Sequence, residues 1–453
     1  MNLSGDPRQA LVLLGQRFGD LFDLFAREGR RLYLVGGSVR DALLGDTHRA
    51  DYDFATDALP EESLRILRAA GLRTFPIGAR FGTIAAAISD TLVEITTFRV
   101  QEAYEPGSRK PEVEFGDSLD DDLSRRDLSI NAMAIDRHGH LIDPFDGCSA
   151  LERRILEVPR GGLENTRSIL RDDPLRLLRI ARFAGRLGFA PTPDTTQAAM
   201  DCRAELLRIS RERWKMEMDK LLLTRHADQG LAWLAHTGAL QVVLPATGPL
   251  VRLGQVRRVG AQLLDTPDDL MTRWSVLLLH TVVTEHTDCR LDLSRSLETW
   301  PDEPLRTAFA SGVASRFRFS NAERQCVERL LGGIPDPASL RADWDRPALR
   351  RHLIGFGEDA IRVLDLLDAV GDTVPGLTEH TGRLREALVS LRSVEDPLPR
   401  LPKGLGHALH EQLGMPRGPA LAEAMARLRE AILDEALAND PDIDACIGWL
   451  RDN

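Results

Sequence analysis

The stretch Leu32–Thr56 of this 453-residue chain reads LYLVGGSVRDALLGDTHRADYDFAT, and its pattern decides the fold that we expect. The apolar segment Tyr33–Val35 predicts a short buried strand. Gly36 and Gly37 interrupt that strand and leave no side chains in the way of a ligand. The two glycines would therefore lie between the end of a strand and the start of a helix.

The helix after the glycines is predicted over Val39–Leu44, with Ser38 as a favourable N-cap residue and Gly45 as its end. Free backbone N–H groups and the helix dipole at such an N-terminus can hold an anion, typically a phosphate group. Arg40 would add a fixed positive charge to the same site. The stretch therefore predicts a phosphate-binding turn.

Two carboxylates, Asp51 and Asp53, follow with one residue between them. Residues i and i+2 of a strand point to the same face, so these side chains would repel each other unless a cation lay between them. Mg²⁺ is the usual cation, because it takes carboxylate oxygens together with the phosphates of a substrate. A lone Gly-Gly is usually a turn and a lone Asp-x-Asp a solvated loop, but both in this order favour phosphoryl or nucleotidyl transfer.

The composition sets the class of protein. The net charge is -11, which argues against a general nucleic-acid coat protein but leaves room for a local basic groove. The five cysteines lie far apart and form no Cys-x-x-Cys pair, so neither a zinc site nor a disulfide framework is expected. The longest apolar run, around Trp274–Val283, is too short to span a bilayer. We expect a cytoplasmic enzyme without a membrane partner.

The rest of the first 100 residues predicts two helices and two strands. Apolar residues at helical spacing predict a helix over Pro7–Gly29, and a second helix is predicted over Glu61–Ala70. Phe81–Ile88 and Leu92–Phe98 read as strands joined by a turn. Glu94 lies between apolar neighbours in the second strand. It would be either a third carboxylate near the aspartates or an outward-facing strand glutamate.

A second motif, SRRDLSINAMAID, covers Ser124–Asp136. Two adjacent arginines, Arg125 and Arg126, are costly at the start of an apolar segment unless they bind something. Their guanidinium groups suit a triphosphate. The neighbouring Asp127 suits a ribose 2′-hydroxyl, which would favour ribonucleotides over deoxynucleotides.

The chain reads as helical from Leu151 onward, and its most informative segment is Leu170–Phe189. We expect this segment on one helix with Pro174 in the first turn. Arginines fall on one face of that helix and apolar residues on the opposite face. The alternative is an ordinary amphipathic helix with solvated arginines. The basic face consists of Arg176, Arg179, Arg182 and Arg186.

These motifs resemble the signature of the class II tRNA nucleotidyltransferase and bacterial poly(A) polymerase superfamily. The resemblance includes GGSVRD…DYDF and the RRD motif with Asn131, although Leu128 and Ser129 stand where the family more often has Phe-Thr. It also includes a Glu-Asp-x-x-Arg motif that selects nucleotides in the family, here Asp173 and Arg176 with an aspartate in the first position.

The resemblance implies an α+β fold in which a small mixed-sheet nucleotidyltransferase head precedes an all-α neck, body and tail. We expect the head over residues 1–150 and a helical neck with the nucleotide-selecting helix over 151–228. A helical body over 229–393 and a helical, tRNA-binding tail over 394–453 would follow.

The resemblance also implies the activity. The enzyme would add CCA, or part of it, to tRNA 3′ ends from CTP and ATP, without a template. Two Mg²⁺ ions about 4 Å apart, held by Asp51 and Asp53, would activate the 3′-hydroxyl and neutralise the triphosphate, with Glu94 as a possible third carboxylate. The nucleotide-binding residues would be Gly36, Gly37, Arg40, Arg126, Asp127, Asn131, Asp173, Arg176, Arg179 and Arg182.

Asp173 and Arg176 suit the choice of C and A over U and G. The Watson–Crick edges of C and A each present an amino donor beside a ring-nitrogen acceptor, and U and G present the reverse. A carboxylate only accepts and a guanidinium only donates, so this pair can match C and A but not U and G. The alternative is a plain ion pair at the start of a helix.

Three further segments match the family by position. Tyr104–Pro111 is polar and corresponds to a flexible loop near the active site. Ile142–Gly147 matches a short motif that acts as a hinge. Arg208–Leu223, with Ser210 as its N-cap, resembles a neck helix that steadies the selecting helix. The polar residues of that helix, for which we expect a structural role, are Glu212, Arg213 and Glu217.

Beyond Gly230 the chain is helical and less specific. Many relatives carry an HD metal-phosphohydrolase domain here, but His280 is followed by Thr281, so we expect a core histidine rather than a metal ligand. Asp396–Gly404 reads as a linker. The segment after it resembles the family's tail, including a Gly-Pro turn before a helix.

Other activities stay open at this stage. The closest alternative is a poly(A) polymerase of the same superfamily, although INAMA at Ile130–Ala134 is the form associated with CCA addition. An enzyme that adds only A or only CC is a second alternative. A catalytically inactive RNA-binding relative is a third, but Asp51, Asp53, Arg126 and Arg176 are intact, which argues against it.

Overall fold

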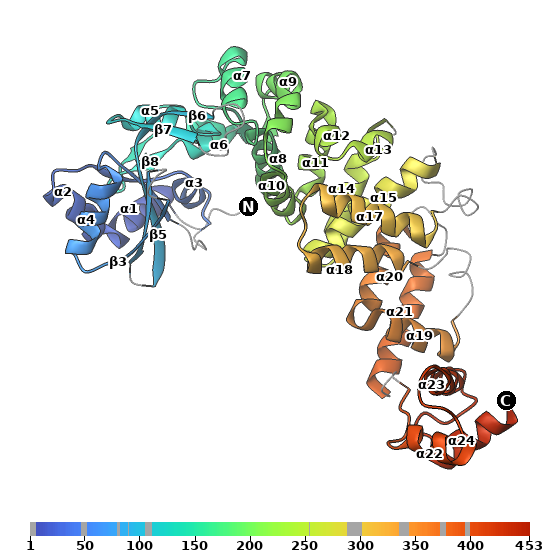
Figure 1. The fold of residues 1–453 in the computed structure, drawn as a ribbon. Coiled ribbons are helices and arrows are strands. Elements are labelled where there is room, and N and C mark those ends of the chain that lie inside the picture. Colours follow the sequence, from blue (N-terminus) through green and yellow to red (C-terminus); the bar gives the residue numbers. More distant parts are fainter. Residues whose placement is uncertain are drawn as a thin grey trace. The chain divides into compact units, whose positions relative to one another are not determined.

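The computed structural model describes residues 6–46, 52–78, 82–88, 90–104, 111–252, 254–287, 301–334, 344–371, 377–394 and 399–453. The chain forms two compact units, Met1–Pro245 and Ala246–Asn453. In Figure 1 the blue-to-green part of the ribbon holds the sheet, and the yellow-to-red part is helical in its described residues. This arrangement confirms the α+β fold class.

A seven-stranded sheet forms the core of the first unit (Figure 1). Its strands are β1 (Leu32–Val35), β2 (Tyr52–Thr56), β3 (Arg73–Gly78), β4 (Thr83–Ile88), β5 (Thr91–Thr97), β8 (Ala134–Ile135) and β9 (Leu141–Ile142). The strand order is β3-β4-β5-β2-β1-β8-β9. The pair β2–β5 is parallel, and the other neighbouring pairs are antiparallel.

Among the described residues, six α-helices and one 3₁₀ helix accompany the sheet. They are α1 (Pro7–Arg17), α2 (Gly19–Arg27), α3 (Gly37–Leu43), α4 (Pro60–Ala69), α5 (Leu119–Ser124), η2 (Ser129–Asn131) and α6 (Gly147–Arg153). Tyr52 and Phe54 of β2 are buried on one face of the sheet, where their rings pack against Phe18. Because successive strand residues alternate between faces, Asp53 lies on the opposite face.

The expected single helix Pro7–Gly29 is two helices, which was not predicted. The break is at Phe18, whose backbone leaves the helical conformation (φ -107°, ψ 19°). Its ring centroid lies 4.8 Å from that of Tyr52 and 5.2 Å from that of Phe54. The chain therefore turns where a large side chain must enter the core of the sheet.

Further strands were missed by the sequence analysis. Arg73–Gly78 is an edge strand, β3, and β6 (Arg99–Tyr104) pairs with β7 (Pro111–Phe115) as a separate hairpin. Tyr104 and Pro111, the expected ends of the flexible loop, pair with each other. Residues 105–110 between them lie outside the described part of the chain.

The second half of the first unit is mainly helical. Its elements are β10 (Ile155–Leu156), α7 (Leu163–Asp172), α8 (Arg176–Leu187), β11 (Ala190–Pro191), α9 (Pro193–Cys202), η3 (Arg203–Arg208), α10 (Arg211–Leu222), α11 (Ala227–Thr237) and α12 (Ala239–Val243). Helix α8 packs against α10 and α11. The crossing of α8 and α11 needs small residues, because a Cβ on Gly230 would lie 2.5 Å from the carbonyl oxygen of Ala181. Helix α11 also continues across the expected boundary between residues 228 and 229.

The described residues after Pro245 are helical. The elements are η4 (Pro245–Thr247), α13 (Gly248–Arg252), α14 (Val256–Asp265), α15 (Leu270–Thr287), α17 (Glu303–Arg316), α18 (Asn321–Gly332), α19 (Arg346–Phe356), η6 (Gly357–Asp359), α20 (Ala360–Gly371), α21 (Leu377–Val394), α22 (Leu405–Leu413), α23 (Pro419–Leu433) and α24 (Ile443–Asp452). The last three helices share a core cluster of their own. Gly418 and Pro419 form the expected Gly-Pro turn at the start of α23. Residues 395–398 of the expected linker lie outside the described residues.

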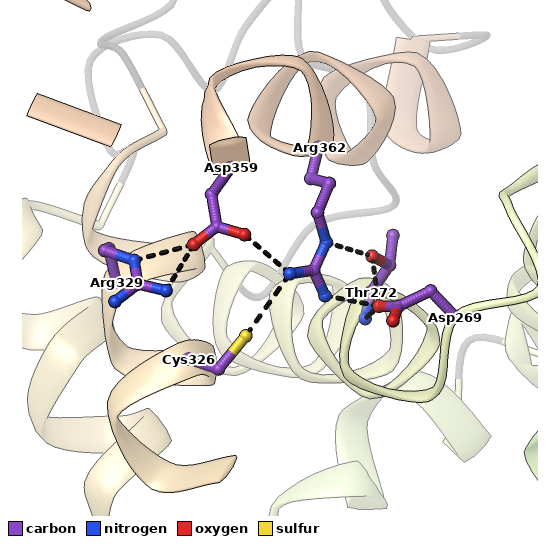
Figure 2. A network of polar contacts seen from close by, with 6 residues as sticks. All are labelled: Asp269, Thr272, Cys326, Arg329, Asp359 and Arg362. Carbon is purple, nitrogen blue, oxygen red and sulfur yellow. Dashed lines mark hydrogen bonds and ion pairs between the residues drawn. The ribbon is translucent and has the colours of Figure 1, made fainter. Parts of the chain in front are cut away.

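A polar network centred on Arg362 joins α15, α18 and α20 (Figure 2). The Arg362 guanidinium donates to Oδ1 of Asp359 at 2.6 Å, to Oγ1 of Thr272 at 3.0 Å and to Asp269. Asp359 also accepts a hydrogen bond from Nε of Arg329 at 2.7 Å. Asp269 accepts from the backbone N–H of Thr272 and so caps the first turn of α15. Arg362 therefore links the start of α15 to the start of α20, and Asp359 extends the network to Arg329 of α18.

His280 on α15 is fully buried in the second unit, as expected for a core histidine. Burial, reinforced by the positive charge of Arg258, lowers its pKa to about 4. The neutral imidazole is therefore the form that the folded protein holds. Across the described residues, no helix has both the length and the apolar character needed to cross a membrane.

The burial of His280 predicts that the protein loses stability on mild acidification. The unfolded chain protonates this histidine near its ordinary pKa of 6.5 and the folded chain only near 4, so the unfolded state binds more protons between these values. The contribution of His280 to the free energy of unfolding is therefore complete above pH 6.5, and the free energy falls by about 3 kcal/mol as the pH drops to about 4. Urea unfolding of His280→Leu between pH 6.5 and 4.5 should show a flatter dependence than the parent protein. The exposed His407→Leu should leave the slope unchanged, and an equal slope in both variants would contradict the assignment.

Candidate active site

One cavity in the first unit brings most of the predicted site residues together. It has a volume of about 460 Å³, and nine arginines line it against three aspartates. Such an excess of positive charge in a concave site attracts a polyanion. The lining residues are Gly36, Gly37, Arg40, Asp53, Arg99, Arg125, Arg126, Asp127, Asn131, Asp173, Leu175, Arg176, Arg179, Arg182, Phe183, Arg186 and Arg213.

The glycine turn starts α3 earlier than the sequence analysis expected. Gly36 has a φ of 74° and occupies the N-cap position, so the helix begins at Gly37, and Ser38 lies buried inside its first turn. The expected N-cap role of Ser38 is therefore wrong. A Cβ on Gly36 would lie 2.8 Å from Nη1 of Arg126. The glycine thus supplies both the left-handed backbone and the space that Arg126 needs beside the turn.

Arg40 is buried and bonded to other side chains, so its guanidinium is not solely available for a phosphate group. Its side chain is 1% exposed and donates to the carboxylate of Asp41 and to Oδ1 of Asn131. Asn131 in turn donates to Asp127 at 2.9 Å. Arg40 therefore touches the cavity and also links the first motif of the sequence to the second.

Two carboxylates lie beside each other on adjacent strands, and one of them, Asp53, is among the cavity-lining residues. Asp53 of β2 lines the cavity, and the parallel register places Glu94 of β5 beside it on the same face of the sheet. Glu94 is exposed. Neighbouring strands lie about 4.8 Å apart, so both carboxylates can approach one cation, and oxygen ligands suit a hard divalent ion. Asp51 lies outside the described residues, two positions before Asp53.

Asp122 orients the two adjacent arginines of the second motif. This carboxylate is 2% exposed and accepts hydrogen bonds from Arg125 and Arg126, both at 3.1 Å, and from the backbone N–H of Arg99. Burial alone would raise the pKa of Asp122, but the charges of Arg126 and Arg125 outweigh it and hold the pKa low. Sequence reasoning missed Asp122, although an acid three and four residues before two arginines is a recognisable helical spacing.

Asp127 is bonded to protein groups on both oxygens. Arg179 donates to Oδ2 through Nε at 2.8 Å and Nη2 at 2.5 Å, and Asn131 donates to Oδ1. Burial would raise the pKa of Asp127, but the charge of Arg179 and these hydrogen bonds hold it well below the usual range. The carboxylate stays ionised, and Oδ1, which accepts one hydrogen bond, keeps a lone pair for a further donor.

The nucleotide-selecting segment is not one continuous helix. Helix α7 ends at Asp172, Asp173 is extended, and regular α8 begins at Arg176, because the residue before Pro174 is driven out of the helical conformation. Pro174 therefore lies two residues before α8 and not in its first turn, as was expected. Oδ1 of Asp173 accepts from the N–H of Leu175 at 3.2 Å, which orders this turn.

Asp173 and Arg176 both line the cavity, but each has other partners. Oδ2 of Asp173 accepts from Arg213 of α10 at 3.0 Å. Arg176 donates to the carbonyl oxygens of Ile169 at 2.9 Å and Arg125 at 2.6 Å. These partners hold an acceptor and a fork of donors side by side at the cavity wall.

The other arginines of α8 are paired as well. Arg182 donates to the buried Glu217 of α10 at 2.6 Å, and Arg186 donates to Asp41 of α3 at 3.0 Å. An amphipathic helix with solvated arginines is therefore not what this stretch forms. Sequence reasoning missed Arg99, Asp41 and Phe183 as neighbours of the site, since only proximity in three dimensions identifies them.

Two family sequence models match parts of this chain. The sequence model described as "Poly A polymerase head domain" matches residues 32–157. A second model, described as "Probable RNA and SrmB- binding site of polymerase A", matches residues 188–249. The first model lies within the first unit of the structure, and the second runs from that unit to four residues past its end.

Curated relatives and solved structures extend the similarity. The CCA-adding enzyme of Geobacillus stearothermophilus is 41% identical over 427 residues, which cover 94% of each chain. That of Geobacillus kaustophilus is 40% identical over 227 residues, which cover 50% of this chain and 54% of the relative, or about half its length. A crystal structure of the Bacillus stearothermophilus CCA-adding enzyme in complex with CTP has a TM-score of 0.70 and 28% identity, and covers 99% of this chain and 98% of that one.

The role of Asp122 gives a prediction in which orientation and net charge act in opposite directions. Asp122→Asn makes the cavity more positive, which by itself would tighten the binding of a polyanion. It also removes the acceptor that orients Arg125 and Arg126, and we expect this loss to dominate. Isothermal titration with inorganic triphosphate should show about tenfold weaker binding, the equivalent of one charge-assisted hydrogen bond. Asp120→Asn, an exposed change on the same helix, is the control. Tighter binding by Asp122→Asn would show that net charge, not orientation, controls the site.

Proposed function

This chain belongs to the class II CCA-adding enzyme and poly(A) polymerase family, and we propose that it adds C, C and A to tRNA 3′ ends from CTP and ATP without a template. One observation carries the proposal. A single arginine-lined cavity holds Asp53 of the central strand β2, the RRD motif beside the glycine turn, and the Asp173–Arg176 segment at the start of α8. These are the parts that a nucleotidyl transfer with side-chain selection of the base requires.

Nucleotidyltransferases of this family generally use divalent metal ions. We propose that Asp53, with Asp51 and Glu94, holds Mg²⁺ at the end of β2. When bound, the ion would favour the ionised RNA 3′-hydroxyl and offset the charge of the triphosphate and of the leaving pyrophosphate. The position of Asp53 and Glu94 on one face of the sheet supports this assignment.

The triphosphate would lie against the glycine turn and Arg126. The N–H groups at the start of α3 and the guanidinium that contacts Gly36 offer donors on one side of the cavity. The 3′-oxygen of the RNA attacks the α-phosphorus, a new phosphodiester bond forms, and pyrophosphate leaves with the β- and γ-phosphates. The arginines bind and orient these charges, so the reacting atoms start close together.

Asp127 would accept a hydrogen bond from the ribose 2′-hydroxyl. Asn131 and Arg179 hold its carboxylate ionised and oriented, which keeps one acceptor ready for this donor. A deoxynucleotide lacks the hydroxyl and would leave that acceptor unpaired. This geometry supports a preference for ribonucleotides.

Asp173 and Arg176 would read the base. Arg213 occupies one oxygen of Asp173, so the carboxylate retains acceptor capacity for the amino group of C or A. Arg176 uses Nη1 and Nη2 for two carbonyl oxygens and keeps further N–H donors for the ring nitrogen. Both residues are thus fixed by contacts that leave their recognition groups available.

The direct test incubates the purified protein with three tRNA substrates, which end before CCA, after C or after CC, and with one nucleotide triphosphate at a time. Incorporation of C on the first two and of A on the third, and then arrest, is the expected result. Unlimited addition of A would mean a poly(A) polymerase. Addition to only one of the substrates would mean a partial activity, and absence of transfer to all three would contradict the proposal.

The metal assignment predicts that Asp53→Ala abolishes transfer while the fold stays intact. Removing a carboxylate from a metal site relieves repulsion and leaves no cavity in the core, so the melting temperature should not fall. Turnover at saturating Mg²⁺ should drop by about 10³-fold or more, the equivalent of several kcal/mol of lost charge stabilisation. Asp57→Asn, beyond the other end of β2 and paired with Arg31, is the control. Near-normal turnover of Asp53→Ala would show that this residue holds no essential ion.

The base-reading assignment predicts that Asp173→Ala and Arg176→Ala erode the preference for CTP and ATP over UTP and GTP. Unpaired buried polar groups give discrimination of about 10⁴-fold, and most of it should be lost when either partner is removed. The measurement is kcat/KM for all four nucleotides, and Arg171→Ala, exposed at the end of α7, is the control. If both variants kept full selectivity, the choice of base would reside elsewhere.

A further inference from the structure

Helix α8 contacts the sheet region, residues 6–153, along one stripe of its surface. The stripe consists of Arg179, Phe183 and Arg186, which are four and three residues apart and therefore share a face. Arg179 donates to Asp127 at 2.8 Å, and Arg186 donates to Asp41 at 3.0 Å. Between them, the ring of Phe183 lies 5.0 Å from the guanidinium of Arg40.

The two acceptors of this stripe belong to one connected network. Asn131 donates to Asp127 at 2.9 Å, and Arg40 donates to Asn131. Arg40 also donates to Asp41 through Nε at 2.8 Å and pairs with it through Nη2 at 2.7 Å. Arg179 and Arg186 are joined through the backbone of α8, and with that link the contacts close into a ring. We call it the polar ring, and its members are Asp41, Arg40, Asn131, Asp127, Arg179 and Arg186.

The dimensions of the ring fix the position of α8. Arg179 and Arg186 are seven residues apart, or about 10 Å along a helix axis. On the other side, Asp127 and Asp41 are held apart by the side chains of Asn131 and Arg40. Together with the contact between Arg176 and the carbonyl oxygen of Arg125, these two attachment points restrict both the tilt and the sliding of the helix, which one contact could not do.

Burial makes these contacts specific. Asp41 is 2% exposed and Arg40 1% exposed, so neither can exchange its partner for water without a large desolvation cost. Connected buried networks favour one arrangement over alternatives, because a half-satisfied network is costly. Arg186 and Arg179, the two members on α8, are half-buried.

We propose that Asp41 and Arg186 are positioning residues that set the distance between the base-reading end of α8 and Asp53. Asp41 lies on α3, which packs against β2, the strand that carries Asp53. Arg186 lies on the helix whose first turn carries Arg176. The pair therefore couples the position of the incoming base to the position of the reacting phosphate, and this inference rests on the function proposed above.

Asp41 and Arg186 differ in their relation to the cavity, and this difference shapes the test. Arg186 lines the cavity, whereas Asp41 is not among the described lining residues. If Arg186 acted by touching the nucleotide, removal of Asp41 would have an independent effect. If both act through their mutual contact, removal of either side chain causes the full loss of kcat, and removal of the second adds nothing.

The experiment is a double-mutant cycle with Asp41→Asn, Arg186→Gln and the combined variant, in full-length protein with tRNA that ends before CCA. Each single change should lower kcat for CTP by about 10- to 100-fold, as expected for a small misplacement of reacting groups, with a smaller change in KM. Misincorporation of UTP should rise in both. The double variant should be no slower than the slower single variant, because residues that act as a unit are not additive. If the decrease in kcat of the double variant equalled the product of the two single decreases, the proposal would be overturned.

Two further variants separate positioning from a general loss of structure. Arg186→Lys keeps a donor for Asp41 and should recover a large part of kcat relative to Arg186→Gln. Arg167→Gln removes a comparable arginine pair, with Asp201 and Glu164, away from the cavity and should leave kcat unchanged. If Asp41→Asn does not fold, equal kcat values for the lysine and glutamine variants of Arg186 would overturn the proposal. A similar loss in Arg167→Gln would do the same.

The outcome for the unmodified protein distinguishes the two proposals. If the parent enzyme does not add C or A to tRNA, the proposed function fails and the positioning role fails with it. If the parent enzyme is active and Asp41→Asn retains full kcat and selectivity, only the positioning role fails.

Discussion

Asp127 accepts two hydrogen bonds from Arg179 across 52 residues of chain, and this kind of contact is what the cavity depends on. Nine arginines around one cavity repel one another at short range, and a flexible guanidinium loses entropy when it is held still. Carboxylates behind the cavity wall offset both costs. Buried acids such as Asp122, Asp41 and Glu217 hold the guanidinium groups in place, so the cavity is ordered before any ligand arrives.

Local periodicity explains why much of this arrangement was predictable from the sequence. The strand, glycine turn, helix and second strand between Leu32 and Thr56 follow from a two-residue alternation and from glycine punctuation. The arginine stripe of α8 follows from a 3.6-residue period. These signals are contained in a few consecutive residues, so neither the distant chain nor the solvent has to be known.

Contacts between distant residues explain what was not predicted. Ser38 has the chemistry of an N-cap, but the left-handed backbone of Gly36 starts the helix first. Asp41 and Arg186 are 145 residues apart in the sequence, so no local pattern predicts that they pair. The edge strand β3 and the β6–β7 hairpin were missed because their strand character depends on the partner strands. The local pattern therefore predicts which residues form the site, but not which acids hold them.

The polar ring has a consequence for how such a sequence can drift over generations. Each of its six members forms hydrogen bonds or ion pairs with one or two other members. A single substitution therefore leaves a buried donor or acceptor without its partner. A change at Asp41, for example, disturbs both Arg40 and Arg186. Substitutions at positions that depend on one another in this way should therefore be correlated. Residues on the exposed face of a neighbouring helix such as α7 can instead be substituted one at a time. Descendants of one ancestor would therefore share the ring as a block or replace several of its members together.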